Sequence, residues 1–182
     1  MLDKKGFDLW AYDYDTIVGL PDDDNTYTFA GYKLILNKIY NEVLDLYSKN
    51  ILDIGYSAET ITIKLYEKWI EVYEQDFSKG MLNIAQAKML KANLYLKDIS
   101  EDLRESLKEG QYDAIIATYS LHHLEDKNKI SLLKSLLPLL VDGGKIFIGY
   151  VAFETRKELE HCKQEAGKYR YSDENYFVYD EI

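Results

Sequence analysis

The sequence has little of what marks a secreted or membrane-embedded protein. It contains a single cysteine, Cys162, so an internal disulfide cannot form. No apolar run approaches the roughly 20 residues that a membrane-spanning helix needs. The basic residues near the N-terminus are not followed by the apolar stretch of a secretion signal. Only two prolines occur and no Pro/Gly-rich linker divides the chain, so we expect one cytoplasmic domain over residues 1–182.

Positive charge is also scarce. The 22 basic residues face 32 acidic ones, which gives a formal net charge of −10. Because most of such a surface repels a phosphate backbone, we do not expect nucleic acid as a partner. Tyrosine, in contrast, is abundant, with 17 residues. Its flat apolar ring with a polar tip suits pockets and interfaces, and it also suits partly buried positions in strands and helices.

Apolar periodicity predicts helices that alternate with strands. Residues 1–29 are interpreted as an irregular arm and residues 30–182 as the core of the domain. Strands are expected at 50–54, 70–73, 93–96 and 112–120, and a turn with a fifth strand at 143–153. Helices are expected at 30–48, 60–68, 78–91, 100–108, 126–140 and 154–166, with Ser78 as an N-cap. Several strands are apolar throughout, which favours a doubly wound α/β fold with a parallel sheet covered on both faces.

Folds of this class bind ligands at the carboxyl ends of their strands. The stretch "ILDIGYSAET" runs from the first strand through Gly55 into a helix, where the backbone can approach a ligand closely. Asp76 ends the second strand 76 − 55 = 21 residues later, near the spacing of an acid that binds a ribose diol. Asp98 closes the third strand and could accept from an adenine amino group. Each aspartate could instead cap a helix, but together we expect Asp53, Asp76 and Asp98 to frame one cavity.

The loop after the first strand indicates which cofactor that cavity holds. A dinucleotide loop has its second and third glycines where this chain has Ser57 and Glu59. A glutamate beside a pyrophosphate is unfavourable, which counts against NAD or FAD. A cofactor with a ribose and an adenine but no phosphate fits better, and S-adenosylmethionine is such a cofactor.

Nearly the whole chain resembles the class I S-adenosylmethionine-dependent methyltransferases of the small-molecule type. "ILDIG" is similar to the first cofactor motif of this family, "VYEQDFSKGMLNIAQAK" to the second, and "KDIS" to the end of the third strand. "YDAIIATYSLHHLED" resembles the fourth-strand motif, "LLPLLVDGGKIFIG" the turn into strand five, and "FDLWAYDYD" the N-terminal arm. The resemblance implies a Rossmann-like fold and transfer of a methyl group from S-adenosyl-L-methionine to a small-molecule acceptor.

The resemblance also implies roles for individual residues. Asp76 would bind the ribose, while Phe77 and Met81 would line the adenine. Aromatic residues of the arm, such as Trp10 and Tyr14, would help to close the site. The implied cofactor-binding residues are Asp53, Gly55, Tyr56, Ser57, Asp76, Phe77, Met81, Asp98, Ile99, Thr118, Tyr119 and Leu121.

Several positions depart from the family pattern. Besides the altered glycines, Glu74 stands where a small residue is common, and Tyr150 where strand five often ends in an acid. Glu59 could repel the carboxylate of the cofactor, or pair with its ammonium or sulfonium. The segment after Gly167 is short, so we expect the last one or two strands of the fold to be missing and a sheet edge to be open to a homodimer. These changes motivate an alternative: a catalytically impaired relative that binds or dimerises, with weak or no cofactor affinity.

Two adjacent histidines, His122 and His123, are candidates for catalysis together with Tyr14. If they lie on a strand, they point to opposite faces. The chain also lacks the residue spacing of a zinc site, so no metal is expected. The alternative is that both histidines shape the rim of the pocket. The acceptor would sit above strands four and five, near these three residues and Tyr150.

Overall fold

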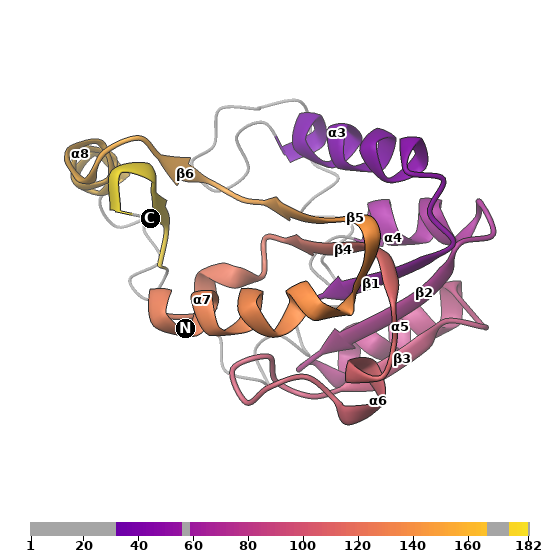
Figure 1. Cartoon of the computed structure of the whole chain (residues 1–182). Helices are drawn as coiled ribbons and strands as arrows, with labels where there is room; N and C mark the ends of the chain where they lie inside the picture. Colours follow the sequence, from indigo (N-terminus) through magenta and orange to yellow (C-terminus); the bar gives the residue numbers. More distant parts are fainter. Residues whose placement is uncertain (1–31, 56–58, 167–174, 182) are drawn as a thin grey trace.

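The computed structural model describes residues 32–55, 59–166 and 175–181, so the predicted N-terminal arm lies outside the described ranges. Helices and strands alternate, as the apolar pattern predicts (Figure 1). In chain order the elements are α3 (Tyr32–Asp45), β1 (Asn50–Ile54), α4 (Glu59–Tyr66), β2 (Glu71–Asp76), α5 (Lys79–Lys88), β3 (Asn93–Leu96), α6 (Glu105–Lys108), β4 (Tyr112–Thr118), η1 (Leu121–His123), α7 (Asp126–Leu136), η2 (Leu137–Leu139), β5 (Leu140–Gly149), β6 (Ala152–Phe153), α8 (Arg156–Ala166), β7 (Phe177–Val178) and η4 (Tyr179–Glu181).

Five of the strands form one parallel sheet in the order β3-β2-β1-β4-β5. From β1 the chain moves outward to β2 and β3, then returns to β4 on the other side of β1 and continues to β5. The strand order therefore reverses between β1 and β4, and the carboxyl ends of these two strands flank the point where doubly wound folds bind ligands. The predicted fold class is confirmed.

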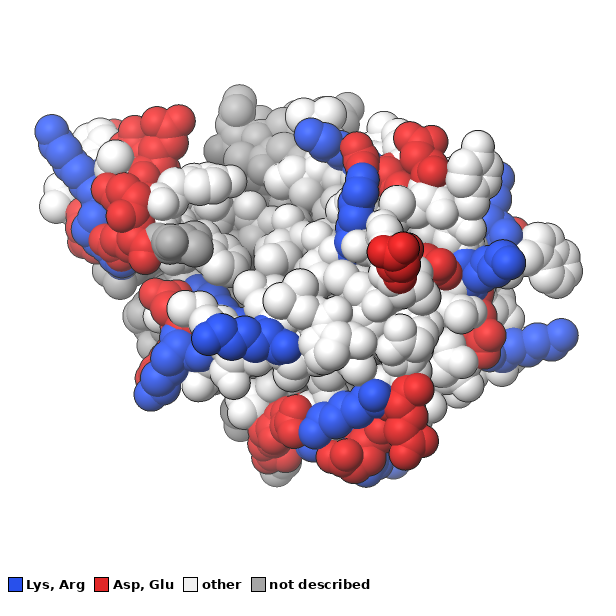
Figure 2. All heavy atoms as spheres, viewed as in Figure 1, with Lys and Arg blue, Asp and Glu red and all other residues white. Residues whose placement is uncertain are grey.

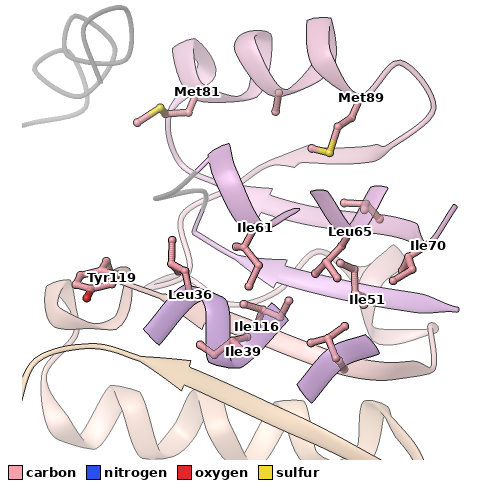
Figure 3. Close-up of a cluster of buried hydrophobic side chains, with 14 residues drawn as sticks. Leu36, Ile39, Ile51, Ile61, Leu65, Ile70, Met81, Met89, Ile116 and Tyr119 are labelled. Carbon is pink, nitrogen blue, oxygen red and sulfur yellow. The ribbon is translucent and has the colours of Figure 1, made fainter. Parts of the chain in front are cut away.

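Helices cover both faces of this sheet. Successive residues of β1 point to opposite faces of the sheet, so Ile51 belongs to one apolar cluster and Leu52 to the other. The first cluster joins the sheet to α3, α4 and α5 and includes Leu36, Ile39, Ile61, Leu65, Met81 and Met89 (Figure 3). The second cluster covers the other face of the sheet. It includes Leu103, which precedes α6, Leu107 of α6, and Leu132 and Leu136 of α7.

The chain beyond β5 forms a small unit beside the main sheet. β6 and β7 pair in parallel, with Ala152 opposite Phe177 and Phe153 opposite Val178. Figure 1 shows this pair with α8 at one side of the molecule. Among the described residues, the main sheet thus has five strands, and the two further strands belong to a separate sheet.

A buried lysine holds the C-terminal strand in place. Lys129 of α7 is 1% exposed and donates through Nζ to the Asn175 carbonyl at 2.6 Å and to Asp126 Oδ1 at 2.9 Å. The same ammonium lies 4.5 Å from the ring centroid of Phe177. Asn175 in turn donates its N–H to the His122 carbonyl at 2.9 Å. These contacts fix β7 beside η1, at the carboxyl end of β4.

The predicted bounds agree best for short apolar strands. β1 and β3 have the predicted limits, and Ser78 is confirmed as an N-cap because its Oγ accepts from Met81 N at 3.2 Å. The predicted helix 100–108 is wrong over its first half, since α6 begins only at Glu105. Upstream, Asp98 Oδ1 accepts from Ser100 N at 2.8 Å and Gln75 Oε1 from Arg104 N at 2.8 Å, which leaves these backbone groups bonded outside a helix.

The surface shows no single dominant charge on the face in Figure 2. Acidic and basic side chains are intermixed around its margin, and its middle is mostly uncharged. Within the described ranges, no helix combines the length and the apolar character needed to cross a bilayer.

Candidate active site

Gly55 directly follows β1, at the point where the strand order reverses. Its φ is +77°, a conformation that side chains other than glycine rarely adopt. A Cβ on this residue would lie 2.4 Å from Ser120 Cβ, and Ser120 Oγ donates to the Ile54 carbonyl at 2.7 Å. The ends of β1 and β4 are therefore joined too closely for any side chain at position 55. Tyr56 and Ser57, which follow, lie outside the described residues, as does the side chain of Glu59.

Three carboxyl groups gather beneath this loop on the face of α4 and α5. Asp53 of β1 lies in register with Glu74 of β2, and Asp76 follows two residues later on the same face. Their exposed fractions are 3%, 0% and 3%. The Thr62 hydroxyl of α4 donates to Asp53, and Asp76 Oδ1 accepts from Ser78 N at 2.5 Å. We call Asp53, Glu74 and Asp76 the carboxyl cluster.

Burial makes two of these carboxyl groups, Asp53 and Glu74, weaker acids. It raises the pKa of Asp53 to about 7, although hydrogen bonds from Thr62 and from the Ile54 backbone act in the opposite direction. The pKa of Glu74 is raised well above its ordinary value by burial first, and then by the negative charges of Asp53 and Asp76. Asp53 and Glu74 therefore tend to retain protons near neutral pH.

Glu74 was noted from the sequence only as a departure from the family pattern, not as part of the site. The signal that could have identified it is the alternation of Val72, Glu74 and Asp76, which puts a glutamate on the buried face of an interior strand, beside Asp53.

Asp98 lies next along the sheet edge. The Lys97 N–H donates to the Asp76 carbonyl at 2.9 Å, which keeps the ends of β2 and β3 together. The Asp98 carboxyl acts electrostatically on His123: burial lowers the pKa of that imidazole, while Asp98 raises it. The ring of Phe77 meets the ring of His123 edge-on, with centroids 6.4 Å apart. The structure thus brings Phe77, Asp98 and His123 to one place.

The other predicted cofactor residues divide between this edge and the core. Met81 and Leu121 are buried in the two apolar clusters, and Ile99 packs against the second. Thr118 closes β4 opposite Gly149 of β5, and Tyr119 follows it, donating its N–H to the Gly149 carbonyl at 2.8 Å.

The two histidines are not on a strand, which corrects the expectation that they point to opposite faces. They belong to the short 3-10 turn η1, and their rings touch with centroids 3.8 Å apart. His122 is 8% exposed, and its pKa falls to about 3 through burial, followed by the charges of His123 and Lys129. Both imidazoles are therefore neutral at physiological pH.

Aromatic side chains continue from His122 toward the C-terminal unit. Tyr150 stacks on His122 with centroids 4.8 Å apart, and Tyr176 stacks on Tyr150 at 5.5 Å. Tyr119 meets Tyr150 edge-on, as Phe153 meets Tyr176. These five residues are called the aromatic wall. Tyr150 was predicted to lie near the acceptor; Phe153 and Tyr176 were missed, because only the pairing of β6 with β7 brings them there. Tyr14 lies outside the described residues.

Within the described ranges, no group of three or more histidine, cysteine, aspartate or glutamate side chains is arranged to hold a metal ion.

Comparison with known proteins identifies the family. A family model described as "Methyltransferase domain" matches residues 51–144, more than half of the chain. Uncharacterized methyltransferases from Anoxybacillus flavithermus and Geobacillus kaustophilus are each 31% identical over 160 residues, which cover 88% of this chain and 72% of each relative.

Solved structures share the fold. Magnesium protoporphyrin IX methyltransferase from Synechocystis superposes with a TM-score of 0.68 at 17% identity, over 98% of this chain and 83% of that one. An S-adenosylmethionine-dependent methyltransferase from Clostridium acetobutylicum gives 0.58 at 21% identity, over 77% of this chain. The chain spans only about half of that protein and of one from Streptomyces venezuelae, 55% and 52%. Together, the matched family model and the 31% identical relatives show that the chain belongs to the class I S-adenosylmethionine-dependent methyltransferases.

Proposed function

We propose that this enzyme binds S-adenosylmethionine across the carboxyl ends of β1, β2 and β3 and transfers the methyl group to a small molecule held above β4 and β5. The observation that carries the proposal is the set of carboxyl groups at three adjacent strand ends, Asp53, Asp76 and Asp98. Carboxylate oxygens accept from ribose hydroxyls, an adenine amino group and an ammonium, and they repel a diphosphate. The groups present therefore fit this cofactor.

The cofactor supplies a methyl group that is already reactive, bound to a sulfonium. The residues of the chain need only orient the acceptor, exclude water and remove a proton where the acceptor carries one. Of the two histidines, His123 suits the last task better. Its imidazole is less buried than that of His122 and lies beside Asp98, which would stabilise the protonated ring. His122, stacked under Tyr150, would instead shape the site.

Three observations support a small-molecule acceptor. Tyr150 and Phe153 of the aromatic wall are only partly buried, so that part of their flat apolar rings is open close to the neutral histidine pair. The net charge of −10 disfavours nucleic acid. Similar structures include proteins whose names specify small acceptors: the Synechocystis magnesium protoporphyrin IX methyltransferase, and an amino pentose methyltransferase from Micromonospora echinaspora.

Calorimetric titration tests the cofactor part of the proposal. The wild-type protein should bind S-adenosylmethionine, and Asp76→Asn should bind it at least about tenfold more weakly, because a hydrogen bond to a charged acceptor is lost. Asp142→Asn, which alters an exposed aspartate of β5, is the matched control and should bind normally. Absence of binding to the folded wild-type protein at millimolar cofactor would overturn the proposal.

Transfer of a labelled methyl group tests the acceptor class. The enzyme is incubated with methyl-labelled S-adenosylmethionine and a cell extract, which is then divided by ultrafiltration. Label should accumulate in the low-molecular-weight filtrate with the wild-type protein, and less with Asp76→Asn. Label confined to retained protein or nucleic acid would show that the acceptor is a macromolecule.

A further inference from the structure

Glu74 has no function in the proposal above, yet it is the most unusual side chain near the site. It is fully buried in β2, in register with Asp53 of β1. Neither of its carboxyl oxygens has a hydrogen-bond partner in the described part of the chain, and Asp53 Oδ1 likewise has none. Three carboxyl oxygens therefore lie together with no hydrogen-bond partner from the described residues, and an unsatisfied buried polar atom is costly.

Among the residues that the structure describes, no positive charge acts on Glu74. Its electrostatic neighbours are both carboxyl groups, Asp53 from β1 and Asp76 from its own strand. On the face of the sheet that carries Glu74, the Thr62 hydroxyl of α4 donates to Asp53, and α5 contributes apolar side chains of the first cluster. The lysines that the structure describes on these two helices are exposed: Lys64, Lys79 and Lys88. The side chain of Glu59 lies outside the described residues.

The chemistry of these atoms specifies the group they would bind. A group that replaces the protons which burial keeps on Asp53 and Glu74 must itself be cationic, and it must offer several hydrogen-bond donors. An α-ammonium group has one positive charge and three N–H donors. A sulfonium has the charge but no donor, and a ribose hydroxyl can donate but has no charge. Of the polar groups on the cofactor, only the ammonium meets both requirements.

We propose that Asp53 and Glu74 together bind the α-ammonium group of S-adenosylmethionine, which makes Glu74 a cofactor-binding residue of this enzyme. This inference rests on the proposed function. Without the cation, burial keeps protons on the pair, since the pKa of Asp53 lies at about 7 and that of Glu74 is raised. When the ammonium binds, the Glu74 carboxyl loses its O–H proton to the solvent and faces the ammonium as a carboxylate. Cofactor binding is thus coupled to proton release.

Calorimetry in buffers of different ionisation enthalpy counts the released protons directly. The titrations are made at about pH 6.5, where a free α-amino group is still protonated and does not contribute. S-adenosylmethionine and S-adenosylhomocysteine both have the ammonium, and each should release protons. Methylthioadenosine has the adenosine and sulfur but no amino-acid end, and should release none. Release with S-adenosylmethionine alone would point to the sulfonium and overturn the assignment.

A pair of variants locates the effect. Glu74→Gln should lower the affinity for S-adenosylmethionine about tenfold and reduce proton release, without changing the affinity for methylthioadenosine. Glu71→Gln, an exposed glutamate on the same strand, is the control and should change neither. Circular dichroism verifies that both variants fold. If Glu74→Gln does not fold, the number of protons released by the wild-type protein still tests the proposal.

The outcomes separate this inference from the proposed function. Binding of S-adenosylmethionine without proton release, and unaltered in Glu74→Gln, would overturn the role of Glu74 and leave the proposed function intact. Absence of binding to the folded wild-type protein would overturn both.

Discussion

Replacing Gly55 by alanine tests the close junction between β1 and β4 on which the site is built. The added Cβ would lie 2.4 Å from Ser120 Cβ and 3.1 Å from Ser120 Oγ, both on a residue that is itself bonded to the Ile54 carbonyl. The backbone at position 55 would also have to keep a φ of +77° with a side chain attached. Two separate penalties are therefore expected.

A variant at a second glycine separates the cost of the positive φ from the cost of the steric clash. Placing a non-glycine residue in the left-handed region destabilises by about 1–2 kcal/mol, and overpacking of a closed site adds about 1–3 kcal/mol. Gly55→Ala should thus lower the free energy of unfolding by about 2–5 kcal/mol. Gly143 has the same φ of +77°, but an added Cβ there meets nothing within 4 Å. Gly143→Ala should show the first penalty alone.

Urea unfolding measures both variants, with the free energy taken at constant m-value. Adding Ser120→Gly to Gly55→Ala should recover the overpacking part, because it removes the Cβ that the new methyl group meets. By itself, Ser120→Gly should cost about 1 kcal/mol through the lost hydrogen bond to Ile54. If Gly55→Ala and Gly143→Ala are equally destabilised, the junction is not sterically closed and the reasoning is wrong.

Two further predictions concern buried charge. In the cofactor-free protein, Asp53 and Glu74 hold protons that the unfolded chain releases. The stability that these two groups contribute is therefore present below about pH 4 and falls as the pH rises through about 7, with a slope of up to about 1.4 kcal/mol per pH unit for each proton. Unfolding curves across this range should show a smaller loss for Glu74→Gln than for the wild-type protein, and equal losses would contradict the pKa shifts. Lys129→Met should lower stability by about 1–3 kcal/mol, because the Asn175 carbonyl loses its buried donor, and hydrogen exchange should speed up at β7. The control Lys127→Met removes an exposed ion pair with Glu125 and should change stability by less than about 1 kcal/mol.

The fold was predictable because its strands are short apolar runs separated by helical patterns. β1 and β3 could be delimited to the residue, since β1 begins after Lys49 and stops before Gly55, and β3 begins with Asn93 and stops before Lys97. Asp76 and Asp98 could be placed at neighbouring strand ends for the same reason. In a parallel sheet, the end of each strand fixes which side chains share an edge.

What could not be predicted depends on contacts between distant residues. The first half of the predicted helix 100–108 does not form. The Arg104 N–H donates instead to the side chain of Gln75, which is 29 positions away in the sequence. The two histidines turn toward each other because the chain leaves β4 in a 3-10 turn rather than continuing as a strand. Glu74 could be noted as unusual, but its lack of donors is a property of the packed structure.

His122 joins the aromatic wall to the C-terminal unit through both its backbone and its ring. Its carbonyl accepts from Asn175, while its ring stacks on Tyr150, which in turn supports Tyr176. Lys129 binds the same Asn175 from the other side. If the acceptor is held above β4 and β5 as proposed, the partly buried Tyr150 ring that meets it is held between two buried side chains, His122 and Tyr176, which are more than 50 positions apart. The position of this ring therefore depends on one buried lysine, Lys129. Changes in residues 175–178 should therefore alter the choice of acceptor more than the affinity for the cofactor, which we propose is bound by strands on the opposite side of β4.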